Sequence, residues 1–310
     1  YFIKERTATG FNLQANPHTA TKIEGPESVS LNYLPKSDNP KADTEKFLKA
    51  DFDLIWSPRL ADIDPLVSKG YDTHHPRLGF TFFASLNSDT VDQQNRSYIQ
   101  KLLNPNSFTY KDSWRKKPAF QLYLPNGPGR ISDKEAEKIW TDIAKTPDPK
   151  VKKKQLTILL PSAFELTDAV NEKLTSAGYQ TVLKKYRDFT EYANEIRTNT
   201  YDIVFANNDF SSIDLRGNIA VTFNPERPLI LASKKNPQIS NIVNGIVKET
   251  NYENRNSRIK ELGKSLISDA YIIPIYYHEV LVLTKPGFDL SAWSQIVPEI
   301  GIWKVKKLKN

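Results

Sequence analysis

The chain has 310 residues, of which 39% are hydrophobic and 25% are charged. This length indicates about two domains, the apolar fraction excludes a disordered chain, and no apolar run approaches the roughly 18 residues of a membrane-spanning helix. Because Cys is absent, disulfide scaffolds, Cys-ligated metals and cysteine nucleophiles are excluded.

Two features indicate that the sequence is incomplete. Met is absent, and the chain begins at Tyr1-Phe2-Ile3 with no initiator and no signal-peptide layout. We therefore expect modified methionines to have been left out and the N-terminal part of the protein to be missing.

The chain is basic, with 43 Lys and Arg residues against 36 Asp and Glu residues, a net charge of +7. Such a charge is compatible with a basic protein that binds a polyanion. The basic residues are nevertheless interleaved with acids, and the dense runs at 150–154 and 304–309 are typical of solvated surface. Nucleic acid is therefore not expected as a partner.

The first region, to about residue 105, is predicted to alternate short strands with short helices. Residues 28–34 place Val29, Leu31 and Tyr33 on one face of a half-buried strand. Further strands are predicted over 52–56 and 78–86, and helices after Asp43 and over 93–103. Residues 104–130 are rich in Pro, Asn and Gly, which indicates a loop that is either a domain crossover or a wall of a functional site.

The next region predicts an α/β fold. Ser132 and Glu135 form a capping box at the start of a helix, Asp188 is a helix cap, and Gly178 follows a helix end. The predicted order is strand 155–160, helix 163–177, strand 179–185, helix 189–197 and strand 201–206. Strands that alternate with helices in this way are parallel and have right-handed crossovers.

The last region begins with a span of loops to residue 236. Helices are predicted over 238–249 and 253–268, followed by strands over 271–277, 280–284 and 300–305. Pro274 lies in the middle of a predicted strand, which favours an edge position or a bulge.

Catalytic and nucleotide-binding motifs are not found in the sequence. The loop Pro161-Ser162-Ala163-Phe164-Glu165 after the first parallel strand has no glycine, so it is neither a Walker loop nor a dinucleotide-binding turn. His18, His74, His75 and His278 show no metal-ligand spacing, and no nucleophile motif stands out. We therefore expect no enzyme, no catalytic residue, no cofactor and no metal.

A candidate binding site follows the third parallel strand. Asn207, Asn208 and Asp209 come directly after this strand and are flanked by Phe205 and Phe210. Open α/β sheets bind ligands outside the carboxyl ends of their strands, and a carboxylate there can pair with an ammonium group. The alternative is that Asp209 only caps the next turn.

Several segments together resemble solute-binding protein family 5, the oligopeptide- and dipeptide-binding proteins of ABC importers. They are Thr9-Gly10-Phe11, FDLIW at 52–56, LGFTFFASLN at 78–87, the unit that ends in YDIVFANNDF at 201–210, and SDAYIIPIYYHEVLVLTKPGF at 268–288. The resemblance extends over nearly the whole chain, in the order in which the family has these segments.

The resemblance implies a two-lobe periplasmic-binding-protein fold of type II, with mixed sheets flanked by helices and a ligand cleft between the lobes. Residues 1–105 are then the latter part of lobe one, 106–275 are lobe two, and 276–310 return to lobe one. The first part of the family's fold has no counterpart in this sequence.

The resemblance also implies a function. The family holds an extended peptide between the lobes through main-chain hydrogen bonds, fixes its amino terminus with an aspartate, closes about a hinge, and delivers the ligand to a membrane permease. Asp209 and Phe210 match the end of that aspartate segment, whereas Ala206 stands where the family often has Trp. Because of this departure, a non-peptide, amine-bearing solute is an alternative ligand.

Two weaker site candidates are Phe83, as a pocket wall, and Arg197, which either faces a ligand carboxylate or is a helix-end cation. By the resemblance the protein is a monomer at the periplasmic or extracellular face of the membrane, either free or lipid-anchored. The competing classes are an enzyme built on the same scaffold and a basic polyanion-binding protein.

Overall fold

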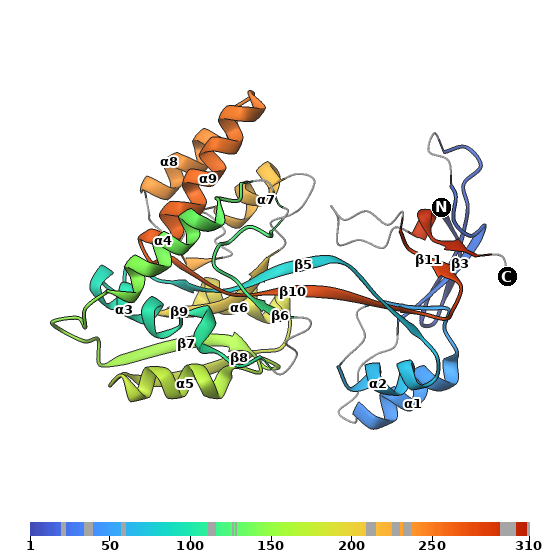
Figure 1. The fold of residues 1–310 in the computed structure, drawn as a ribbon, viewed down its shortest axis with the longest axis horizontal. Coiled ribbons are helices and arrows are strands. Elements are labelled where there is room, and N and C mark those ends of the chain that lie inside the picture. Colours follow the sequence, from blue (N-terminus) through green and yellow to red (C-terminus); the bar gives the residue numbers. More distant parts are fainter. Residues whose placement is uncertain are drawn as a thin grey trace. The chain divides into compact units, whose positions relative to one another are not determined.

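The structure is a computed structural model (Figure 1). It describes residues 1–19, 23–33, 40–56, 60–110, 116–125, 127, 129–208, 215–224, 230–231, 237–291 and 302–308. The chain forms two compact units: unit 1 comprises Tyr1–Leu78 and Glu279–Asn310, and unit 2 comprises Gly79–His278.

The change from unit 1 to unit 2 lies earlier in the chain than the lobe boundary predicted near residue 105. Strand β5 (Asp72–Leu86) and helix α3 (Gln93–Leu102) supply Phe82, Leu86 and Ile99 to the core of unit 2, which is why this unit begins within β5, at Gly79. The chain returns from unit 2 to unit 1 between His278 and Glu279. The assignment of the two units to the two lobes stays a prediction.

Unit 2 is built on a mixed sheet. Its strands besides β5 are β6 (Lys116–Pro118), β7 (Gln155–Pro161), β8 (Gln180–Tyr186), β9 (Ile203–Asn208) and β10 (Ile272–Thr284). They lie in the order β10-β5-β9-β7-β8, with β6 beside β10. Strands β8 and β9 pair with β7 in parallel, as predicted, and β5 pairs antiparallel with β9.

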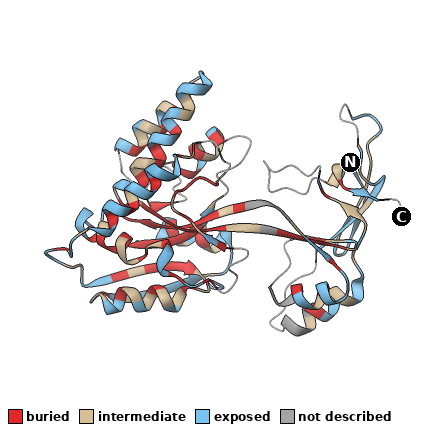
Figure 2. Ribbon diagram, viewed as in Figure 1, coloured by how far each residue is buried: buried red, intermediate tan, exposed pale blue. Residues whose placement is uncertain are grey.

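Helices of unit 2 supply apolar residues to a buried cluster on each face of this sheet. One cluster includes residues of α3, α4 (Asp133–Ala144) and α5 (Thr167–Ser176). The other includes residues of α6 (Phe189–Thr198), α7 (Leu215–Thr222), α8 (Pro237–Lys248) and α9 (Tyr252–Ser268). Buried residues accordingly occur along β5, β7, β9 and β10, whereas the edge strand β8 has none (Figure 2).

The apolar run of β7 has a direct explanation in these two clusters. Leu156, Ile158 and Leu160 point into one cluster and Leu159 into the other. A strand covered on both faces needs apolar side chains on both, so the run is nearly continuous rather than alternating.

The predicted helix caps are confirmed. Ser132 and Glu135 form a reciprocal capping box at the start of α4, and the carboxylate of Asp188 accepts a hydrogen bond from the backbone N–H of Glu191 at the start of α6. Gly178, which follows α5, has a φ of 92°, a left-handed conformation that favours glycine.

Three predicted elements differ from the structure. The strands predicted over 271–277 and 280–284 are the single strand β10, and Pro274 lies outside its pairings with β6 and β4. Residues 302–304, predicted as part of a strand, form the 3-10 helix η3 (Ile302–Lys304). The long loop at 104–130 contains β6, because this segment pairs with residues 276–278 of β10.

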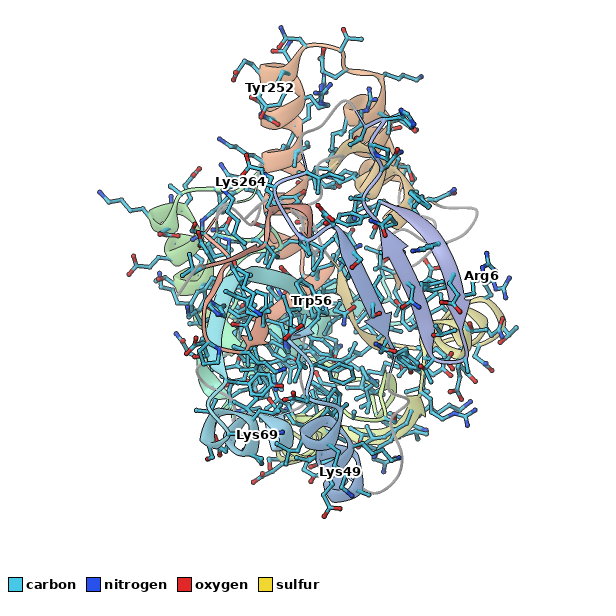
Figure 3. All side chains as sticks on the ribbon, turned by 90° about the vertical axis from the view of Figure 1, so that its right-hand side faces the viewer. Arg6, Lys49, Trp56, Lys69, Tyr252 and Lys264 are labelled. Carbon is cyan, nitrogen blue, oxygen red and sulfur yellow. The ribbon has the colours of Figure 1, made fainter. Side chains whose placement is uncertain are left out.

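Unit 1 has less buried structure. Its elements are β1 (Phe2–Thr7), β2 (Gly10–Gln14), β3 (Ser28–Asn32), α1 (Pro40–Ala50), β4 (Leu54–Trp56), α2 (Leu60–Ser68), β11 (Phe288–Asp289), η3 and β12 (Lys306–Lys307). The sheet β1-β2-β3 has no buried residue, and the predicted apolar face of β3 is not covered, since Tyr33 beyond it is 71% exposed. Basic side chains such as Arg6, Lys49 and Lys69 are exposed in this unit (Figure 3).

We expect the two units of this chain to differ in local stability. Amide hydrogens of β1–β3 should exchange through openings of low free energy, whereas those of β7 and β9 should approach the free energy of global unfolding, because only the latter lie between two buried clusters. Native-state hydrogen exchange read by mass spectrometry checks this. Equal protection of β2 and β7 would contradict it.

No helix in the part of the chain that the structure describes is long and apolar enough to cross a membrane.

Candidate ligand-binding site

A pocket of about 750 Å³ lies within unit 2, where the parallel strands end. Pro161, Tyr186 and Asn208 are the last residues of β7, β8 and β9, and all three line it. Because parallel strands end at the same edge of a sheet, the helices and loops that follow them enclose a crevice there. The position agrees with the crevice predicted from the sequence.

One side of the pocket is apolar. Phe83, Ala206 and Ile230 are buried and form part of its wall, with Phe83 paired to Ala206 across β5 and β9. Two further apolar residues of the lining are largely exposed, Phe189 at 65% and Val221 at 61%. Exposed apolar side chains beside a buried apolar wall favour contact with an apolar part of a ligand.

Polar side chains of the lining form a closed ring of hydrogen bonds. Asn208 donates from Nδ2 to Thr222 Oγ1 at 2.7 Å, and Asn218 donates from Nδ2 to Asn208 Oδ1 at 3.2 Å. Thr222 donates in turn to Asn218 Oδ1 at 3.3 Å. Asn218 and Thr222 lie four residues apart on α7, so they share the helix face that meets the end of β9.

Tyr186 and Tyr192 also line the pocket, and their phenol groups are uncharged. The Tyr186 hydroxyl donates to the backbone carbonyl of Phe205 at 3.0 Å, and the Tyr186 and Tyr192 rings are 5.0 Å apart. Burial raises the pKa of both phenols above the usual value, so both keep their protons near neutral pH. The one carboxylate among the described lining residues is Asp188, which caps α6.

The structure separates the residues predicted to bind a ligand. Phe83, Asn207 and Asn208 line the pocket together. Asp209 and Phe210 lie outside the described residues, so their roles stay predictions.

Two further candidates lie elsewhere. The Phe205 side chain is fully buried on the other face of the sheet, where its ring stacks with that of Phe82 and packs at a tilt against that of Phe164. Arg197 is exposed in the last turn of α6 and bonds to Ala193 and Asn194 of the same helix. This position fits the helix-end alternative of the two given for Arg197.

Sequence reasoning missed several lining residues. Tyr186, Tyr192, Asn218 and Thr222 are separated from Asn208 along the chain and belong to three other elements, β8, α6 and α7. The only local signal was the position of Tyr186 directly after the predicted parallel strand 179–185. Nothing in the sequence around Asn218 indicated that α7 lies beside β9.

No group of three His, Asp or Glu side chains that could hold a metal ion occurs among the described residues.

Comparisons with solved structures find the same fold in binding proteins of ABC transporters. NikA from Brucella suis, solved with Fe(III)-EDTA, matches 98% of this chain over 67% of its own length, with a TM-score of 0.72 and 14% identity. The murein tripeptide binding protein MppA of Escherichia coli matches 100% of this chain over 64% of its own, with a TM-score of 0.68 and 18% identity. DppA from Helicobacter pylori, solved with the peptide STSA, matches 97% over 61%, with a TM-score of 0.67 and 14% identity.

Sequence comparisons find no match, either among family models or among curated proteins. The structural matches confirm the predicted fold class, an α/β fold with mixed sheets and helices like that of the two-lobe periplasmic binding proteins. The chain spans about two thirds of the length of these structures or less.

Proposed function

We propose that this chain acts as the solute-binding receptor of an ABC importer, which captures its ligand outside the cytoplasm and delivers it to a membrane permease. The observation that carries the proposal is the pocket at the carboxyl ends of β7, β8 and β9, in a fold shared with such proteins. On this proposal the protein binds its ligand without chemical change, as a monomer at the periplasmic or extracellular face. The lipid anchor and the closure of two lobes stay predictions.

A peptide is the ligand we propose first. Two of the matching structures are described as a murein tripeptide binding protein and as a complex with the peptide STSA. A peptide offers main-chain donors and acceptors that are the same for every sequence, so affinity does not depend on one side chain. The second candidate is a non-peptide solute, since NikA was solved with Fe(III)-EDTA.

Polyanion binding receives less support from the structure. Two lysines of the basic run at 150–154 are engaged in ion pairs, Lys152 with Asp148 at 3.4 Å and Lys153 with Asp202 at 2.6 Å. A basic run whose charges are partly neutralised by its own protein is a poor site for phosphates.

The test is to identify a ligand that co-purifies. Native mass spectrometry of the freshly purified full chain should show a bound mass that is released on unfolding and that sequences as a short peptide. Isothermal titration of the stripped protein with that peptide should then give saturable, equimolar binding. Failure to find any bound ligand, together with no binding of a mixed tripeptide library, would overturn the proposal.

Asp209 provides a sharper prediction about a peptide ligand. If its carboxylate pairs with the ligand's amino terminus, Asp209→Ala should weaken binding by roughly tenfold to a hundredfold, the worth of a charge-assisted hydrogen bond. The same peptide with an acetylated amino terminus is the control, because it has no ammonium group to lose. Equal losses for both peptides would show that Asp209 acts in another way.

A further inference from the structure

We propose that the pocket formed by β7–β9, α6 and α7 accepts an uncharged, amide-bearing group of the ligand and rejects a carboxylate of the same shape. The inference rests on the proposed function only in taking this pocket as the ligand site. It adds the chemical class that the pocket selects.

The amide groups in the pocket are held by hydrogen bonds to one another and to Thr222. In the ring of Asn208, Asn218 and Thr222, each side chain donates one hydrogen bond to the next and accepts one from the previous. Thr222 is only 2% exposed, so its hydroxyl cannot exchange this partner for bulk water. A ring of this kind resists a 180° rotation of one amide alone, because that rotation would set the N–H groups of Asn208 and Asn218 against each other.

The ring leaves Asn208 with unused hydrogen-bonding capacity. A carboxamide has two N–H groups and an oxygen with two lone pairs, and the ring uses one N–H and one lone pair of Asn208. Asn208 is half-buried and lines the pocket. It therefore offers a donor and an acceptor on one side chain, which complements a ligand group that also carries both, such as an amide.

Charge in the pocket disfavours an anion. No Lys or Arg occurs among the described lining residues, and the one carboxylate there, Asp188, has the same sign as a ligand carboxylate. The phenols of Tyr186 and Tyr192 keep their protons and add no charge. A carboxylate that entered would lose hydration without gaining a counterion from the described lining residues, whereas a neutral amide loses far less.

The apolar wall defines the rest of the preferred group. Phe83, Ala206 and Ile230 provide a buried apolar surface, and Phe189 and Val221 extend it into solvent. A ligand group with an aromatic or aliphatic part and a terminal amide therefore matches both the apolar wall and the polar side chain of Asn208.

Benzamide and benzoate test the inference directly, because they have nearly the same shape and differ in charge. Ligand-observed saturation-transfer NMR with the full chain should give a dissociation constant for benzamide at least about tenfold below that for benzoate, the difference of one good hydrogen bond. Asn208→Leu should weaken benzamide binding by about fivefold or more. Thr222→Val, which keeps the side-chain shape but opens the ring, should also weaken it.

Thr141→Val is the matched control, since Thr141 lies on the exposed face of α4, where its hydroxyl bonds only within the helix, and benzamide binding should be unchanged. Equal binding of benzoate and benzamide, no binding of either, or an Asn208→Leu variant that binds as well as the parent would overturn the inference. If a variant does not fold, the ratio of the dissociation constants of benzoate and benzamide for the unsubstituted chain still decides the test. If the chain prefers benzamide to benzoate but binds no peptide, only the proposed peptide ligand is refuted. If it binds a peptide but does not prefer benzamide to benzoate, only this inference is refuted.

Discussion

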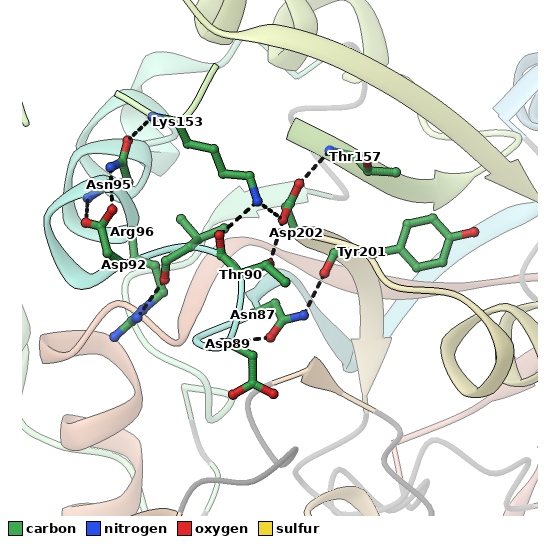
Figure 4. A network of polar contacts seen from close by, with 11 residues as sticks. Asn87, Asp89, Thr90, Asp92, Asn95, Arg96, Lys153, Thr157, Tyr201 and Asp202 are labelled. Carbon is green, nitrogen blue, oxygen red and sulfur yellow. Dashed lines mark hydrogen bonds and ion pairs between the residues drawn. The ribbon is translucent and has the colours of Figure 1, made fainter. Parts of the chain in front are cut away.

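Asp202→Ala is expected to lower the free energy of unfolding of unit 2 by about 3–4 kcal/mol, a large part of the stability of a typical domain. The Asp202 side chain is 7% exposed. Its carboxylate accepts hydrogen bonds from Lys153 Nζ at 2.6 Å, from Thr90 Oγ1 at 2.6 Å and from the backbone N–H of Thr157 at 2.8 Å (Figure 4).

The size of this effect follows from what alanine leaves behind. The ammonium of Lys153 would lose its counterion, and the half-buried donors of Thr157 and Thr90 would lose the acceptor that Asp202 provides. Asp202→Asn should also destabilise, by about 1–2 kcal/mol, because the amide nitrogen would face a donor where the carboxylate has an oxygen.

Urea unfolding followed by far-UV circular dichroism measures both variants. The matched control is Asp142→Ala, which removes an ion pair with Lys145 of similar kind at 3.2 Å but between exposed side chains. We expect the control to change stability by less than about 1 kcal/mol. A loss as small for Asp202→Ala as for Asp142→Ala would show that burial does not strengthen the Asp202 network.

Phe205→Ala is expected to cost about 3–5 kcal/mol of stability through loss of buried surface and formation of a cavity. The Phe205 ring is fully buried, 5.1 Å from the Phe164 ring and 6.3 Å from the Phe82 ring. Phe82 also stacks on Tyr276 at 4.9 Å, so the cavity would open within a continuous aromatic cluster.

A conservative substitution at Phe205 distinguishes a packing role of this side chain from a role in ligand binding. Phe205→Leu keeps most of the buried volume, so we expect it to retain ligand affinity while it loses some stability. Phe189→Ala is the control, because Phe189 lines the pocket but is 65% exposed, and it should change stability by less than about 1 kcal/mol. A folded Phe205→Leu variant with abolished ligand binding would instead support the predicted direct role of Phe205.

The part of the fold that could be predicted from sequence is the part set by local interactions. The Ser132–Glu135 capping box, the Asp188 cap and the left-handed Gly178 each involve residues within a few positions of one another. The alternation of apolar strands with amphipathic helices from residue 155 to 206 likewise depends on local periodicity, which is why β7, β8 and β9 were correctly predicted to be parallel.

Unit 1 shows where local patterns were misleading. The alternating pattern of residues 28–34 predicted one buried face, but no residue of β1-β2-β3 is buried in this chain. Residues 302–304 had the composition of a strand but form η3. The alternation of apolar and polar residues in a strand indicates which side chains can be buried. They are buried only if another element packs over them.

The sequence by itself determined that an α/β unit would end in Asn207-Asn208 at the carboxyl edge of a sheet, where a ligand site was expected. Only the tertiary structure decided which side chains meet there. It placed Phe205 in the core and Ala206 in the pocket wall, brought Asn218 and Thr222 of α7 to Asn208, and paired Lys153 with Asp202. Local propensities act over one or two turns, whereas these contacts join residues from 10 to 49 positions apart. Such contacts depend on how the sheet and helices pack as a whole.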